Sequence, residues 1–345
     1  MTVPERDAVV AAGGIAELGA EATAARMSYG EGALVVCDQV VRIYTGEGIE
    51  VQALQGLDLL IGQGELIAMV GASGSGKSTL MNILAGLDTP TAGRVRVAGQ
   101  DLGALSAKQR LIYRRQQVGF VWQQTSRNLL PYLTAKQNVV TPMRFSGYRR
   151  RLRDDRAMEL LEVLGVAHCA NRVPSRMSGG EQQRTAIATA LANEPRLLLA
   201  DEPTGELDSR TAQEVFRALQ TANTELGATV LVVTHDSAVS HQVQRTVAIR
   251  DGRTSSETLR HDAADELGNT VRQAVEYAVL DRAGRVQLPR EMTERHQMRD
   301  RVRLLSLDDH IGVWPDRPAG AGRHSGLGRH FGSGRHAGHG KDGAA

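Results

Sequence analysis

The chain has 345 residues, of which 41% are hydrophobic and 23% charged, and these ordinary globular values exclude a wholly disordered or fibrous protein. Its 41 Lys and Arg residues against 39 Asp and Glu residues leave a formal charge of +2, too little to favour a nucleic-acid-binding protein on charge alone. Two cysteines exclude a disulfide framework, and the longest apolar runs fall far short of the ~20 residues that span a bilayer.

The first 33 residues are rich in Ala, Gly and Glu and show neither helical nor strand periodicity. We expect residues 1–33 to be a mobile leader, without the basic and apolar pattern of a signal peptide. Apolar, β-branched stretches then alternate with helical stretches from residue 34 to 255, which predicts an α/β domain with mainly parallel strands. Within it, residues 124–178 are mostly helical and predict an inserted helical subdomain. We expect both cysteines, Cys37 and Cys169, to pack in the core.

A glycine-rich loop follows the apolar stretch at 65–70 and leads into a helical stretch. Its sequence is Gly71-Ala72-Ser73-Gly74-Ser75-Gly76-Lys77-Ser78-Thr79. Strand, loop and helix stand in the order of a phosphate-binding P-loop, whose backbone N–H groups and helix N-terminus hold phosphates. In such a loop Lys77 reaches the β- and γ-phosphates and the Ser78 hydroxyl ligates Mg²⁺. The alternative is a chance match in a glycine-rich chain, which the flanking pattern disfavours.

A second candidate phosphate cradle precedes another helical stretch, with the sequence Ser178-Gly179-Gly180-Glu181. Such a helix N-terminus binds anions, although an ordinary cap by Ser178 explains the same residues. Two cradles for one nucleotide indicate that the second acts across an interface between subunits.

Two carboxylates follow the apolar stretch at 197–200. The C-terminal ends of strands are where ligands bind in open α/β sheets. Phosphoryl transfer needs one carboxylate for Mg²⁺ and another for the attacking water, so we assign Asp201 to the metal and Glu202 to the water. Alternatively, the two carboxylates simply mark the change from strand to loop. The P-loop earlier in the chain makes this alternative less favoured.

In combination, these motifs resemble the ATP-binding subunit of an ABC transporter over residues 35–255. The ordered set comprises Walker A at 71–79, Gln123, the signature at 178–184, Walker B at 197–202, Asp208 and His235. The sequence around Gln123, together with 128–135 and the signature, is similar to that of the lipoprotein-release, macrolide-export and cell-division ATPases. Met177, Trp122 and Glu181 depart from the commonest family residues, but every residue needed for catalysis is present.

The resemblance implies roles for individual residues. Tyr44 matches the aromatic residue that stacks on adenine, Gln123 the glutamine that senses Mg²⁺ and the membrane partner, and His235 the histidine that contacts the γ-phosphate. Each of these three, taken alone, is more simply structural. The residues matching the ATP contacts from the opposite subunit and the dimer seam are Ser178, Gly179, Gly180, Glu181 and Asp208.

The resemblance also implies partners and a location. It predicts a membrane-associated ATPase at the cytoplasmic face that binds ATP and Mg²⁺ and dimerises with a second copy of itself. Closure and hydrolysis are then passed to a separate integral membrane permease, for export or mechanical signalling. One alternative is a soluble ABC ATPase, but its usual long coiled coil or second ATPase domain is missing from this sequence. Another is a regulator whose C-terminal part binds DNA.

The polar, turn-rich residues 256–272 predict a linker to a small β-rich unit at 273–316. In that unit we expect a hairpin over 276–288, a short helix from Pro289, and a second hairpin over 301–314. The pattern resembles the swapped-hairpin fold of AbrB-type regulators, which implies an interleaved dimer that holds two ATPase domains close together. Its charge of −1 lacks the basic footprint of DNA binding, so we expect no nucleic-acid partner.

A Gly-Arg-His repeat occupies residues 317–345, which we expect to be disordered. Five basic residues against one acidic residue give this tail a charge of +4, so the rest of the chain carries −2. The histidines can converge on a divalent metal, although a solvated tail without function is the simpler hypothesis.

Overall fold

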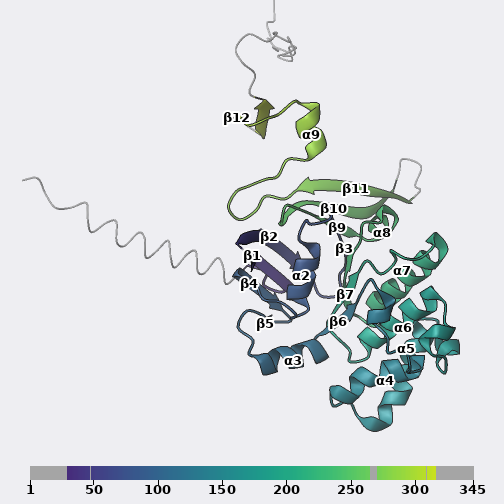
Figure 1. Ribbon diagram of the computed structural model, residues 1–345. Helices are drawn as coiled ribbons and strands as arrows, with labels where there is room; N and C mark the ends of the chain where they lie inside the picture. The colour runs from purple at the N-terminus through teal and green to yellow at the C-terminus, as the bar shows by residue number, and fades with distance from the viewer. Residues whose placement is uncertain (1–28, 47, 265–269, 308, 316–345) are drawn as a thin grey trace, which may run out of the picture. The chain divides into compact units, whose positions relative to one another are not determined.

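The computed structural model describes residues 29–46, 48–264, 270–307 and 309–315. It divides into a larger unit that ends at Gln287 and a smaller unit that begins at Leu288 (Figure 1). The tail expected at 317–345 and most of the expected leader lie outside the described residues. Among those described, no helix combines the length and apolar character needed to cross a membrane.

The larger unit is built on a seven-stranded sheet in the order β11-β10-β9-β3-β8-β7-β6. Its parallel strands are β3 (Leu66–Val70), β6 (Val118–Val121), β7 (Leu197–Asp201), β8 (Thr229–Val233) and β9 (Arg245–Arg250). These strands are short, nearly continuous apolar runs, as expected for a parallel sheet covered on both faces. The predicted α/β fold with mainly parallel strands is confirmed.

One face of this sheet is covered by helix α2 (Lys77–Leu84) and by a four-stranded antiparallel sheet. That second sheet has the order β2-β1-β4-β5 and comprises β1 (Val35–Gly46), β2 (Ile49–Ile61), β4 (Ala92–Val97) and β5 (Gln100–Asp101). Leu80 and Ile83 of α2 share one buried cluster with Val35 of β1 and Ile67 of β3. Figure 1 shows α2 beside β1 and β2. Helix α3 (Ala107–Gln116) adds Tyr113 to the same cluster.

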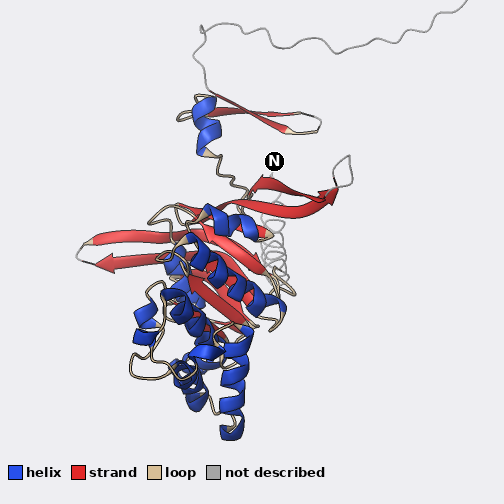
Figure 2. Ribbon diagram, turned by 90° about the vertical axis from the view of Figure 1, so that its right-hand side faces the viewer, coloured by secondary structure: helices blue, strands red, loops and turns tan. Residues whose placement is uncertain are grey.

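A second buried cluster lies on the opposite face of the central sheet, beneath helices (Figure 2). The helices are α4 (Ala135–Phe145), α5 (Arg153–Val163), α6 (Gly179–Leu191), α7 (Ser209–Thr224) and α8 (Ser237–Gln242). Four short 3₁₀ helices accompany them, at Thr125–Arg127, Arg150–Leu152, Ala167–Cys169 and Pro174–Arg176. Cys169 is buried in this cluster and Cys37 in the first, and both are free thiols, so the expected core packing of the cysteines is confirmed.

The linker predicted at 256–272 is wrong for the residues that the structure describes there. Strand β10 (Arg253–Ala264) pairs antiparallel with β9, and β11 (Thr270–Ala278) pairs antiparallel with β10. The side chains described in these two strands at 256–261 and 273–278 are half-buried or exposed, so polar residues are tolerated there. Polar side chains also tie it down, since Arg245 of β9 binds Glu257 of β10 at 2.8 Å.

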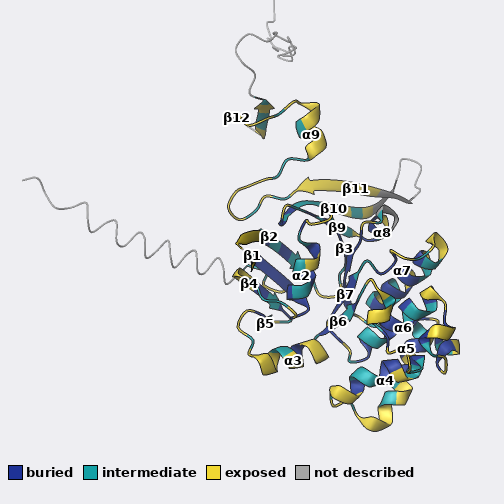
Figure 3. Cartoon of the chain, in the orientation of Figure 1, coloured by how far each residue is buried: buried dark blue, intermediate teal, exposed yellow. Residues whose placement is uncertain are grey.

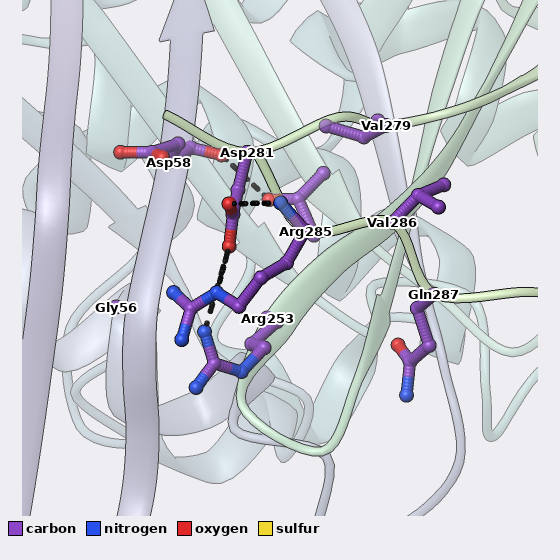
Figure 4. Close-up of a pocket in the computed structure, with 9 residues that line it drawn as sticks. Gly56, Asp58, Arg253, Val279, Asp281, Arg285, Val286 and Gln287 are labelled. Atoms are coloured by element: carbon purple, nitrogen blue, oxygen red, sulfur yellow. Dashed lines mark hydrogen bonds and ion pairs between the residues drawn. The ribbon is translucent and has the colours of Figure 1, made fainter. Parts of the chain in front are cut away.

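The hairpin predicted over 276–288 also differs from the structure. Residues 276–278 pair with β10, and a single bridge between Leu280 and Val286 closes the expected turn at 281–284. Asp281 lies between Arg285, at 2.7 Å, and Arg253, at 3.7 Å, and a cavity of about 240 Å³ lies beside them (Figure 4). This turn contacts β1 through the ion pair of Arg282 with Asp38.

The start of the domain lies slightly earlier than the expected leader boundary at residue 33. Residues 29–32 form turns rather than a mobile segment, and Arg96 holds them by donating a hydrogen bond to the Tyr29 carbonyl oxygen at 2.9 Å. The Arg282 guanidinium lies 4.8 Å from the centre of the Tyr29 ring.

The smaller unit contains helix α9 (Arg290–Arg295) and an antiparallel hairpin of β12 (Val302–Ser306) and β13 (Ile311–Pro315). The predicted short helix and second hairpin are therefore confirmed, although the unit begins at Leu288 rather than at 273. Every residue of β12 and most of α9 are exposed (Figure 3). A two-stranded hairpin alone is only marginally stable, so dimerisation through this unit stays a prediction.

Candidate functional site

The glycine-rich loop lies between β3 and α2 and turns around the first residue of that helix. Gly74 and Gly76 have φ angles of +78° and +103°. A Cβ on Gly76 would lie 2.5 Å from the Ala53 carbonyl oxygen, so only glycine fits there. Helix α2 begins without a side-chain cap and without an acidic residue in its first turn. Its N-terminus therefore presents partial positive charge to a bound anion.

Lys77 is held inside this loop. Its Nζ donates hydrogen bonds to the carbonyl oxygens of Gly71 and Ala72, both at 2.8 Å, and the residue is 9% exposed. The side chain is long and flexible, but these two acceptors confine its charge to the centre of the loop. A phosphate placed over the loop would meet this cation together with the backbone N–H groups.

A cavity of about 580 Å³ opens over the loop and gathers most of the predicted residues. Its lining consists of Tyr44, Val51, Gln52, Ala53, Gly71, Ser73, Gly74, Ser75, Gly76, Lys77, Ser78, Thr79, Asp201, Glu202, Val233 and His235. The contribution of β2, through residues 51–53, was missed because no motif marks that strand. Its apolar alternation gives no signal for a binding role.

Tyr44 is held at the rim of the cavity by two side chains. Its hydroxyl donates to the Asp88 carboxylate at 2.8 Å, and the Arg42 guanidinium lies 4.3 Å from the ring centre. Arg42 and Asp88 are themselves paired at 2.8 Å. An aromatic ring backed by a cation on one face is pre-positioned for stacking on a flat ligand.

The two carboxylates at the end of β7 have different surroundings. Burial raises the pKa of Asp201, the charge of Glu202 adds to this effect, and Lys77 opposes it. Glu202 has a φ of +43°, a strained value for a residue other than glycine. Its N–H donates to the Val233 carbonyl oxygen at 2.8 Å, and its Oε2 lies 2.9 Å from Nδ1 of His235. The backbone thus directs the Glu202 carboxylate toward the strand end that carries His235.

The oxygen atoms at this end of the cavity suit a hard divalent cation. A hydroxyl from Ser78 and a carboxylate from Asp201 line the same cavity, and oxygen donors of these kinds are what Mg²⁺ prefers. Gln123 does not line the cavity. Its amide nitrogen lies 3.8 Å from where a Cβ on Gly205 would stand, and the Gly205 N–H donates to the Glu202 carbonyl oxygen at 3.1 Å.

The signature residues lie apart from this cavity and have local structural roles. Ser178 caps α6 through a capping box with Glu181. Gly180 allows α6 and α7 to pack closely, because a Cβ there would lie 2.4 Å from the Thr211 methyl carbon. Asp208 caps α7 by accepting from the N–H groups of Arg210 and Thr211. Contacts of these residues with ATP on a second copy stay predictions.

Glu181 makes the stability of the fold depend on pH in the acid range. Its carboxylate accepts from the Ser178 N–H at 2.7 Å and contacts His168 Nε2 at 2.8 Å, and these contacts lower its pKa from 4.5 to about 2. Because the pKa of Glu181 is lower in the folded chain than in the unfolded chain, its ionised carboxylate stabilises the fold at pH values above its unfolded-state pKa. This stabilisation is lost as the pH falls toward 2. Between pH 7 and pH 3 we expect the free energy of unfolding in urea to fall by about 1 kcal/mol more for the wild type than for Glu181→Gln, an effect that solvent screening of this partly exposed carboxylate reduces. Equal losses would contradict this role. Glu159→Gln, at an exposed carboxylate on α5, serves as the control.

Comparison with known proteins agrees with this arrangement. The family model described as "ABC transporter" matches residues 54–205. The chain is 39% identical to MJ0796, whose dimeric post-hydrolysis structure is bound to ADP and Pi. This match covers 65% of the present chain and 97% of MJ0796, with a TM-score of 0.59. It is 26% identical to CbiO1 from Clostridium perfringens, described as part of the ABC transporter complex CbiONQ. That match covers 64% of this chain and 86% of CbiO1, with a TM-score of 0.59.

The geometry of the cavity and the near-complete coverage of MJ0796 lead to the same family. This chain belongs to the ABC transporter ATP-binding cassettes and is an ATP-hydrolysing P-loop NTPase.

Proposed function

We propose that this chain is the ATPase subunit of a transporter and that it passes ATP-driven dimer closure and hydrolysis to a separate integral membrane permease. Support comes from MJ0796, which is described as a dimeric ABC transporter cassette, and from CbiO1, which is described as part of a transporter complex. In this role the chain sits at the cytoplasmic face of the membrane. The similarity to lipoprotein-release, macrolide-export and cell-division ATPases favours export or mechanical signalling over nutrient uptake.

ATP binds in the 580 Å³ cavity, with its adenine on Tyr44 and its phosphates over the loop. Lys77 neutralises charge on the β- and γ-phosphates, and the N–H groups of residues 71–79 hold their oxygens. Glu202 accepts a hydrogen bond from the attacking water and thereby polarises it toward the γ-phosphorus. His235, 2.9 Å from that carboxylate, orients it and contacts the γ-phosphate.

Ser78 and Asp201, which line the cavity, would hold Mg²⁺, and the ion would neutralise charge on the phosphate oxygens. The raised pKa of Asp201 is consistent with this role, since a cation beside a partly buried pair of carboxylates relieves their mutual repulsion. The metal role that the resemblance implies for Gln123 stays a prediction, because Gln123 stands outside the cavity.

The second nucleotide contact comes from a second copy of the chain. Ser178, Gly179 and Asp208 are exposed and stand outside the cavity of their own subunit, so they are available to ATP bound by the partner. The unit at 288–315 adds a second dimer contact through the exposed hairpin of β12 and β13. This part of the proposal rests on the AbrB-like pattern and on the small core of that unit.

The observation that carries the permease part of the proposal is a groove of about 470 Å³ beside β6, the strand that leads to Gln123. Its lining, from α3, β6, α4 and α6 and the loops beside them, is Arg114, Arg115, Val118, Gly119, Phe120, Asn128, Pro142, Phe145, Ala186, Thr189, Ala190 and Asn193. Phe145 is 65% exposed there. A mainly apolar groove with polar ends accepts a short amphipathic helix from a partner protein.

Filling the groove tests this assignment. Thr189→Trp places a bulky ring in the groove, and we expect it to abolish both co-purification with the permease encoded beside this chain and stimulation of ATPase activity by that permease. Thr224→Trp is the matched control, since both threonines donate to the carbonyl oxygen four residues earlier in a helix and Thr224 lies outside the groove. Failure of the wild type to co-purify with any neighbouring permease, or an unaffected Thr189→Trp variant, would overturn the proposal.

A further inference from the structure

The segment that joins α4 to α5 carries a concentration of positive charge that ATP hydrolysis does not use. Residues 144–153 contain five arginines and no acidic residue, namely Arg144, Arg149, Arg150, Arg151 and Arg153. The chain as a whole has a charge of only +2, so this segment is a local exception. Four of these arginines are exposed, and Arg153 is half-buried.

Three of these arginines line a hollow of about 550 Å³, whose lining is Val140, Arg144, Arg150, Arg153 and Asp154. Arg153 is fixed by its Nε, which donates to the Tyr148 carbonyl oxygen at 2.9 Å. The acidic residue of this lining, Asp154, is 68% exposed and lies 3.5 Å from the ammonium of Lys136, so its negative charge is already paired with a cation. Within the part of the chain that the structure describes, Arg144 and Arg150 form no ion pair. Their guanidinium groups therefore remain available to an anion.

Several guanidinium groups around one hollow fit a phosphate group, because each offers parallel N–H donors to two phosphate oxygens. A free phosphate ion would need only the arginines. Here two large apolar side chains accompany them in the same segment, Phe145 and Leu152, and they are 65% and 46% exposed. Exposed apolar side chains among cations are typical of a surface that enters the headgroup region of a bilayer.

We propose that residues 144–153 form a binding site for anionic phospholipid. Arg144, Arg150 and Arg153 hold the headgroup phosphate, and Leu152 enters the interface beside it. This inference does not depend on the proposed permease. It rests on the proposed function in one respect: the membrane location favours a lipid over a free phosphate ion as the ligand. It also agrees with the position of the proposed permease groove, since Phe145 at the end of α4 lines that groove. The chain would thus touch protein and lipid with neighbouring surfaces.

The experiment is sedimentation of the full-length chain with vesicles of phosphatidylcholine alone or mixed with phosphatidylglycerol. We expect binding to the anionic vesicles only, falling as salt is added. Removal of a surface arginine costs roughly fivefold in affinity, so Arg144→Gln/Arg150→Gln should bind about 25-fold more weakly. The matched control is Lys108→Gln/Arg217→Gln, which removes two exposed cations outside the segment. It should bind within about threefold of the wild type, because screening limits the effect of distant charges.

Leu152→Ser tests the apolar contact separately. It should weaken vesicle binding severalfold without changing the salt dependence, because it removes no charge. Equal losses in the two double variants would overturn the site in favour of general surface attraction. Complete competition by inorganic phosphate, with no effect of Leu152→Ser, would overturn the lipid in favour of the free ion. Neither result depends on co-purification with a permease in detergent, so failure of this site is distinguishable from failure of the proposed function.

Discussion

Glu202→Gln is expected to lower the steady-state rate of ATP hydrolysis by about 10³-fold while ATP binding is retained. The substitution keeps the size of the side chain but removes the charge that polarises water and that faces His235 at 2.9 Å. In the proposed mechanism dimer closure precedes hydrolysis, so the variant should accumulate as an ATP-bound dimer. Phosphate release measures the rate, and light scattering with and without ATP measures the mass.

The control for this variant is Glu225→Gln at the exposed C-terminal cap of α7, which should hydrolyse ATP at the wild-type rate. Undiminished turnover in Glu202→Gln would remove Glu202 from the proposed mechanism. Loss of ATP binding along with turnover would instead show that the strained backbone at Glu202, with its φ of +43°, does not tolerate the amide.

Lys77→Ala is expected to weaken ATP binding by about 10- to 100-fold, the effect of losing a charge-assisted hydrogen bond to phosphate. The ammonium is held by the Gly71 and Ala72 carbonyl oxygens, and Lys77 is the one lysine or arginine among the described residues that line the cavity. Titration with a fluorescent ATP analogue measures the affinity. Thermal unfolding without nucleotide checks that the variant is folded.

Two further variants of this experiment separate charge from shape. Lys77→Arg keeps the charge but should not restore affinity, because a planar guanidinium does not fit the enclosed space around Lys77, which is only 9% exposed. Lys108→Ala, at an exposed lysine of α3, should bind ATP like the wild type. Unchanged affinity in Lys77→Ala would mean that the backbone N–H groups alone hold the phosphates.

The motifs that were visible in the sequence are those in which neighbouring residues act together. Loop 71–79 binds through its own backbone, and Asp201 and Glu202 are consecutive at the end of one strand, so order along the chain is enough to predict them. The capping box of Ser178 and Glu181 is local in the same way, and it is present at the start of α6.

The wrong prediction at 256–272 concerns strands near the edge of the central sheet. The side chains described in this stretch, at 256–261, are half-buried or exposed, and polarity alone does not distinguish such a strand from a linker. Strand β10 follows β9 after only Asp251 and Gly252, so their pairing is a local hairpin, and the ion pair of Arg245 with Glu257 joins its two strands. The turn at 281–284 is correctly expected, but its contact with Asp38 of β1 has no local signal.

The sequence by itself therefore determined the ATPase chemistry and the α/β class, because the first follows from the order of short motifs and the second from the periodicity of apolar residues. Only the tertiary structure decided which residues share the cavity, since Tyr44 and β2 reach the loop through an antiparallel sheet that packs on α2. It also decided that Arg144, Arg150 and Arg153 line one hollow and that the signature residues lie outside the cavity over the glycine-rich loop. Contacts between elements depend on packing over the whole domain, and no short stretch of sequence records them.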